Sequence, residues 1–191
     1  MLILLRHGRT AANAAGLLQG RVDNELDDVG RVQAVACAAA LARPARVVSS
    51  PLIRARQTAE ALGCPMEIDE RWIELDYGVW DGRPVREVPA HTWAAWRSDP
   101  TFVPPDGESL AALQVRVEEA IADLAEAAAQ QDIVVVTHVS PIKAALAWSL
   151  GGGPSMSWRM NVSQASISRI RTGPPGPAML SFNEVAHLGL R

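Results

Sequence analysis

The chain has 191 residues, 48% of them hydrophobic and 20% charged, and a formal net charge of -3 at pH 7. This length suits one domain with a sizeable core, so we expect residues 1–191 to form a single domain. A chain with this slight negative charge is not expected to have the basic surface that binds nucleic acid or membranes. We therefore expect neither as a partner. Cys37 and Cys64 fit neither a metal-binding spacing nor a disulfide framework. This favours a reducing compartment, so we expect the protein in the cytoplasm.

The first third of the chain alternates apolar runs with helical patterns. The run "LILLRH" (residues 2–7) predicts a buried strand that ends in two polar side chains. An Ala-rich helix is expected after Gly30 and should end near Pro44. A second buried strand, "ARVVSSP" (45–51), ends in a proline, and a helix should follow it and close at Gly63.

The remainder of the chain continues this alternation. Apolar residues spaced by three or four predict an amphipathic helix from Ser109 to about Gln131, followed by the strand "DIVVVTH" (132–138). Ser140 and Pro141 suit the start of the next helix. Two edge strands, "QASISRIR" and "PAMLSFN", are expected after it, joined by the hairpin-like loop "RTGPPGPA".

This order predicts an α/β fold, a three-layer α/β/α sandwich with a mostly parallel central sheet. Ligands of such sheets bind outside the carboxyl ends of the strands. Those ends carry Arg6-His7, Ser49-Ser50 and Thr137-His138, and Arg54 follows in the first turn of the next helix. Two histidines and two arginines beside helix N-termini are suited to an anion, and arginine matches phosphate oxygens bidentately.

Segments along nearly the whole chain resemble, in order, those of the histidine phosphatase superfamily, also called the phosphoglycerate mutase-like family. The Arg-His-Gly signature lies in "LLRHGRTAAN", and the second histidine lies in "VVVTHVSPIK". Between and after them come "GRVDNELDDVGRVQA", "VVSSPLIRARQTAEAL", "ELDYGVWDG", "PDGES" and the closing "SFNEVAHL". A lone Arg-His-Gly would be a weak signal, whereas an ordered series of matches is a specific one.

The resemblance implies a role for each matching residue. His7 would be the nucleophile that forms a phosphohistidine, and Glu74 the proton donor. The equatorial phosphate oxygens would be held by Arg6, Arg54 and His138. Residues that would bind the substrate are Asn13, Gln19, Gly20 and Val139.

The chemistry agrees with this assignment independently of the family. An imidazole attacks a phosphate dianion only where cations offset the repulsion, and those cations also keep His7 neutral. A carboxyl group can protonate the leaving oxygen and later accept a proton from water. The sequence contains no metal-binding His motif, P-loop or Gly-x-Ser-x-Gly elbow, so we expect neither a metal nor a cofactor.

Several candidates have a structural interpretation instead. Glu70, Asp76 and Asp81 are carboxylates near Glu74, and only the family's spacing selects Glu74 among them. We expect a solvated or ion-paired Arg56 and structural roles for His91 and His187, because none of them lies at a predicted strand end. The tryptophans at 72 and 80 should serve packing, and those at 93 and 96, which share a helix face, suit the core better than a substrate lid.

Four positions depart from the family pattern: Arg9, Glu25, Asp27, and Val139 in place of a glycine. None occupies a catalytic position, so the departures bear on the substrate rather than on the reaction.

We therefore predict a metal-independent phosphomonoester hydrolase that acts on a small molecule. A phosphoglycerate mutase is the first alternative, but mutases resemble longer chains with an added basic segment, whereas residues 82–105 are short and aromatic with three arginines. The second alternative is a non-catalytic phospho-ligand binding module, since a fold does not fix a function. The sequence leaves the substrate open. A homodimer is the expected assembly only because dimers are the commonest oligomers of soluble proteins.

Overall fold

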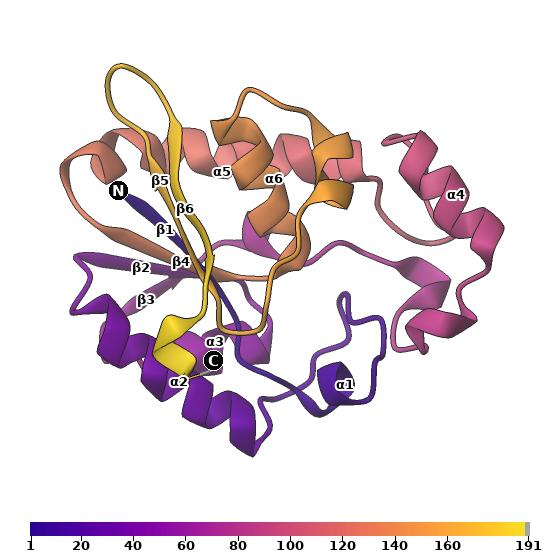
Figure 1. The fold of residues 1–191 in the computed structure, drawn as a ribbon, viewed down its shortest axis with the longest axis horizontal. Coiled ribbons are helices and arrows are strands. Elements are labelled where there is room, and N and C mark those ends of the chain that lie inside the picture. Colours follow the sequence, from indigo (N-terminus) through magenta and orange to yellow (C-terminus); the bar gives the residue numbers. More distant parts are fainter. Residues whose placement is uncertain (190–191) are drawn as a thin grey trace.

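A six-stranded sheet forms the centre of the molecule in the computed structural model, which describes residues 1–189 (Figure 1). The strand order is β3-β2-β4-β1-β5-β6. Strands β1 to β4 pair in parallel, while β5 pairs antiparallel with β1 and with β6. The strands are β1 Leu2–Arg6, β2 Arg46–Ser49, β3 Met66–Ile68, β4 Ile133–Thr137, β5 Ile167–Arg171 and β6 Ala178–Glu184. The predicted fold class, a three-layer sandwich around a mostly parallel sheet, is confirmed.

Alternate residues of each central strand pack against opposite helical layers. Leu2 and Leu4 contact one core, built with α5 (Leu110–Gln130) and α6 (Val139–Ser149). The intervening Ile3 and Leu5 contact a second core, built with helices on the other face (Figure 1). Those helices are α2 (Asp28–Leu41) and α3 (Ile53–Glu60). Burial on both faces explains why the central strands are continuous apolar runs.

Two segments lie outside these layers. Helix α1 (Ala11–Ala14) follows β1 directly, and α4 (Ala90–Ser98) extends from the side of the sandwich (Figure 1). Short 3₁₀ helices occupy Glu70–Trp72, Gly78–Trp80, Val85–Glu87, Pro154–Arg159 and Ala186–Leu188. The hairpin predicted near the end of the chain is confirmed as the β5–β6 pair.

Two helices begin earlier than predicted. The side chain of Asp27 accepts from the Gly30 N–H at 2.8 Å, so α2 starts at Asp28 and Gly30 lies within its first turn. Helix α6 starts at Val139 rather than at the expected Ser140. Its first N–H groups are satisfied by a carboxylate from elsewhere in the chain, described below, so no local cap is needed.

Candidate active site

His7 lies directly after β1, at the carboxyl edge of the sheet. Its side chain is 3% exposed, and its Nδ1 lies 2.7 Å from the carbonyl oxygen of Gly8. A carbonyl only accepts hydrogen bonds, so Nδ1 carries the proton and donates. The free lone pair of the neutral imidazole is therefore on Nε2, the nitrogen that is available as a nucleophile.

The loop after His7 packs backbone against backbone on α2. A Cβ on Gly8 would lie 2.5 Å from the carbonyl oxygen of Gly30, and one on Gly30 would lie 2.0 Å from the carbonyl oxygen of Arg9. Both positions therefore require glycine. The Gly8 N–H also donates to the Thr58 hydroxyl of α3 at 3.1 Å. These contacts fix the backbone that positions the imidazole.

His138 follows β4, and its ring centroid is 5.1 Å from that of His7. Its Nε2 lies 2.7 Å from the hydroxyl oxygen of Ser50. Its Nδ1 is buried and has no hydrogen-bond partner within residues 1–189. The sequence placed Ser50 at this edge without giving it a role, although its position at the end of a central strand was the available signal.

Two buried guanidinium groups complete the site. Arg6 donates from Nη1 to the carbonyl oxygen of Val162 at 2.7 Å. Arg54 donates from Nη1 to the Val22 carbonyl at 2.9 Å and from Nη2 to the Gly20 carbonyl at 2.6 Å. In both arginines Nε is buried and has no partner in the described part of the chain. These charges are thus held by neutral carbonyls, which leaves them available to an anion.

Burial and the two arginines determine the charge state of the histidines. Burial, then Arg54 and Arg6, hold the pKa of His7 well below its ordinary value of 6.5. The pKa of His138 is lowered by burial first, and then by Arg54, His7 and Arg6. Burial lowers the pKa of Arg6 to about 10, so it remains a cation at neutral pH. The four residues Arg6, His7, Arg54 and His138, hereafter the His7 cluster, therefore combine two neutral imidazoles with two positive charges.

Glu74 supplies the carboxylate at the start of α6. Its Oε1 accepts from the N–H groups of Leu75 at 2.8 Å and Ser140 at 3.1 Å, and its Oε2 accepts from the N–H of Val139 at 3.1 Å. Its negative charge acts to raise the pKa values of both cluster arginines. Because it bonds the residues that directly follow His138, its carboxyl group lies next to the cluster.

The segment that carries Glu74 is anchored to α5 by the side chain of Arg116. Arg116 donates from Nη1 to the carbonyl oxygens of Arg71 at 2.6 Å and Ile73 at 2.8 Å. The same guanidinium forms an ion pair with Glu108 at 2.7 Å. Glu108, whose role the sequence left open, thus helps to position this segment.

Of the predicted substrate-binding residues after β1, Asn13 lies in α1, and Gln19 and Gly20 lie in the loop that follows it. Asn13 Nδ2 donates to Gln19 Oε1 at 3.1 Å, and Gln19 Nε2 is buried without a partner among the described residues. Gly20 gives its carbonyl to Arg54. Its N–H donates to Asp81, which also accepts from the N–H groups of residues 21 and 22. Asp81, considered only as a rival of Glu74, therefore organises the loop that anchors Arg54.

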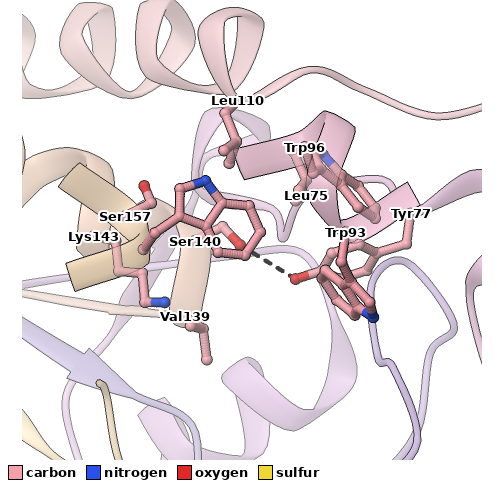
Figure 2. Close-up of a pocket in the computed structure, with 10 residues that line it drawn as sticks. Leu75, Tyr77, Trp93, Trp96, Leu110, Val139, Ser140, Lys143 and Ser157 are labelled. Carbon is pink, nitrogen blue, oxygen red and sulfur yellow. Dashed lines mark hydrogen bonds between the residues drawn. The ribbon is translucent and has the colours of Figure 1, made fainter. Parts of the chain in front are cut away.

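A cavity of about 190 Å³, hereafter the aromatic pocket, opens at the start of α6 (Figure 2). Its lining includes Leu75, Val139 and Ser140, whose N–H groups hold the Glu74 carboxylate. The rest of the lining is Tyr77, Trp93, Trp96, Leu110, Lys143, Ser157 and Trp158. Trp96 is buried as predicted. Trp93 is only partly buried: it packs against the core as predicted, and like Trp96 it also lines the pocket.

The remaining candidates lie away from this site. His91 and Arg56 are exposed. His187 Nε2 lies 3.0 Å from the Ala165 carbonyl oxygen and 3.4 Å from the sulfur of Cys37. The departing residues form local ion pairs, Arg9 with Asp27 and Glu25 with Arg31.

Two kinds of feature are absent from residues 1–189. Within this range no three His, Cys, Asp or Glu side chains are grouped as a metal ion would need. No described helix combines the length and apolar character required to cross a bilayer.

Comparisons with known proteins agree with the site geometry. The chain is 40% identical to a glucosyl-3-phosphoglycerate phosphatase of Mycolicibacterium vanbaalenii, over 82% of this chain and 76% of that protein. It is 33% identical to phosphoserine phosphatase 1 of Hydrogenobacter thermophilus, over 98% and 94% of the two chains. Crystal structures of a phosphoserine phosphatase from Entamoeba histolytica, with phosphoserine or 3-phosphoglyceric acid, match with a TM-score of 0.90 at 28% identity, covering 98% of both chains.

These relatives are phosphatases, which supports hydrolysis over the mutase and the binding-module alternatives. The sequence pattern of the histidine phosphatase superfamily, branch 1, matches residues 2–185. The chain therefore belongs to the histidine phosphatase superfamily and is a phosphomonoester hydrolase of that type, as the sequence predicted.

Proposed function

We propose that the enzyme works in two steps through a phosphohistidine on Nε2 of His7. The observation that carries this proposal is the fixed Nδ1–H of His7, which donates to the Gly8 carbonyl and leaves Nε2 unprotonated. Its lowered pKa keeps the imidazole neutral at physiological pH. Two buried cations beside it offset the repulsion between the nucleophile and a phosphate dianion.

In the first step, Nε2 attacks phosphorus while the ester oxygen leaves with the electron pair of the breaking P–O bond. The equatorial phosphate oxygens are bound by Arg6, Arg54 and His138. Glu74 enters this step as a protonated carboxylic acid, gives its proton to the leaving oxygen and is left as the carboxylate. In the second step, Glu74 takes a proton from water, and the resulting hydroxide displaces phosphate from Nε2. His7 and Glu74 return to their initial states, so the cycle needs no metal or cofactor.

The loops around the cluster complete the substrate site in this proposal. Asn13 and Gln19 would supply amide groups at its mouth, and Gly20 would act through the carbonyl that orients Arg54. The N–H of Val139 is bonded to Glu74, so Val139 would contact the substrate through its side chain, which lines the aromatic pocket.

We infer that residues 1–191 form one domain, because strands from both ends of the chain pair in one sheet. We assign the enzyme to the cytoplasm, since its two cysteines are free thiols. Its substrates would be small phosphomonoesters, as the names of the relatives suggest, rather than nucleic acids or membrane components. A homodimer remains the expected assembly if the chain associates.

The test is to replace His7 with alanine and to look for the phosphoenzyme. Wild-type enzyme mixed with excess substrate and quenched within milliseconds in alkaline denaturant should carry one phosphoryl group, stable to alkali and labile to acid as a phosphohistidine is. His7→Ala should lose this adduct and at least about 10³-fold in kcat, with an unchanged circular dichroism spectrum. The matched control is His91→Ala, an exposed histidine, which should leave both readouts unchanged. An adduct on another residue, or substantial turnover by His7→Ala, would reject His7 as the nucleophile.

A further inference from the structure

In the proposed function, on which this inference rests, Glu74 protonates the leaving group. The aromatic pocket then lies on the side of the site that receives that group. The leaving oxygen must depart near Glu74, and the pocket is lined by the residues whose N–H groups hold the Glu74 carboxylate (Figure 2). Its volume of about 190 Å³ is below the roughly 300–1,000 Å³ of sites for drug-sized ligands. The pocket therefore suits the alcohol portion of a small metabolite.

Lys143 is the cation of this pocket. It follows Val139 by one helical turn, so the two side chains share one face of α6 and line the same cavity (Figure 2). Its ammonium forms no ion pair within residues 1–189. Lys143 is also the only lysine of the chain, whose other 17 basic residues are arginines.

The surroundings of Lys143 favour an added negative charge. Burial is the largest influence on its pKa and lowers it, and the nearby charge of Arg6 lowers it further, while Glu74 acts in the opposite direction. An anion beside the ammonium would offset the cost of burying this charge. The remaining lining is largely aromatic and aliphatic, from Trp93 and Trp158 to Leu110.

We propose that Lys143 binds a carboxylate on the leaving group, so that the enzyme selects phosphomonoesters of small hydroxy acids. A single ammonium is a compact point charge that matches a monoanionic carboxylate. A second phosphate would call for a guanidinium fork or several cations, as in the His7 cluster. The apolar walls would contact the carbon skeleton between the carboxylate and the ester oxygen.

The experiment compares two substrates that differ only in this group, 3-phosphoglycerate and glycerol 3-phosphate. Wild-type enzyme should prefer 3-phosphoglycerate. Lys143→Met should lose roughly 10-fold or more in kcat/KM for 3-phosphoglycerate, mainly through KM, and less than about twofold for glycerol 3-phosphate. Lys143→Arg should restore part of the preference. Arg159→Met is the control, because it removes an exposed charge from the 3₁₀ helix Pro154–Arg159 near the pocket. It should leave kcat/KM for both substrates unchanged.

An equal loss on both substrates would show that Lys143 contributes to phosphate binding or to the fold, and it would overturn the proposal. A wild-type enzyme with no preference between the two substrates would overturn it as well.

A second readout is independent of catalysis. Reductive ¹³C-methylation labels only Lys143 and the N-terminus, and in His7→Ala the Lys143 methyl resonance should shift with 3-phosphoglycerate but not with glycerol 3-phosphate. A shift without turnover by wild-type enzyme would reject the hydrolysis while keeping the carboxylate site, whereas no shift would reject the carboxylate site.

Discussion

The His7 cluster and the aromatic pocket are neighbours built in opposite ways. The cluster sits at the carboxyl ends of β1 and β4 and the start of α3. The hydrogen bonds that its side chains make go to backbone carbonyls or to Ser50. The pocket combines side chains from α4, α5, α6, the 3₁₀ helix Pro154–Arg159 and the loop that carries Leu75 and Tyr77, and most of its lining is apolar. The sheet thus fixes the phosphoryl chemistry, while segments added around it set the space for the leaving group.

Glu74 connects the two regions, and its replacement should give the largest substrate-dependent effect. Glu74→Gln keeps the shape of the side chain but cannot give a proton to the leaving oxygen. We expect a loss of about 10²–10⁴-fold in kcat on glycerol 3-phosphate. On p-nitrophenyl phosphate, whose leaving group needs little protonation, the loss should be at most about 10-fold.

Steady-state kinetics on the two esters measures this contrast, with the exposed Glu70→Gln as the control. Equal losses on both esters would show that Glu74 supports the structure of the site rather than acting as its acid.

Arg54→Lys should impair the His7 cluster alone. A lysine retains the charge but lacks the planar guanidinium that bonds the carbonyl oxygens of Gly20 and Val22 while still facing a phosphate. We expect a loss of about 10²-fold in kcat/KM that is the same for every ester. The exposed Arg56→Lys, on the same helix, should be neutral. A loss that varied with the leaving group would place Arg54 in contact with the pocket.

Trp93→Ala should give the smallest effect, confined to the aromatic pocket. Trp93 stacks on Trp96 with a centroid distance of 5.5 Å and meets Trp158 edge-on at 6.1 Å. Removal of its ring should raise KM for naphthyl phosphate by about 2- to 10-fold and leave methyl phosphate unchanged, while Trp93→Phe should retain most of the affinity. A matching loss on methyl phosphate would mean that Trp93 supports the fold and not the substrate.

The sequence predicted the His7 cluster better than the pocket for a physical reason. Residues at the ends of β1 and β4 follow apolar runs, and the geometry of a parallel sheet brings such ends together. By contrast, Lys143 and Trp158 line the same cavity because α6 packs against the 3₁₀ helix Pro154–Arg159, and such packing leaves no periodic signal in the sequence. Glu74 was found through the family's spacing, because its three N–H partners are invisible in the sequence.

The same reasoning explains the errors in secondary structure. Strand β3 was missed because Met66 is half-buried, Glu67 and Ile68 are exposed, and the three residues form no apolar run at this sheet edge. The start of α6 was placed too late because Ser140 and Pro141 resemble a local cap. The cap is supplied instead by Glu74, which lies far away in the chain.

The peptide groups of residues 20–22 are held between opposite charges. Their N–H groups point to the Asp81 carboxylate, and the carbonyls of Gly20 and Val22 point to Arg54. An arginine held in this way has lost its rotational freedom before any ligand arrives. The conformational entropy of that guanidinium is therefore lost when the chain folds. Phosphate binding does not have to order the side chain a second time.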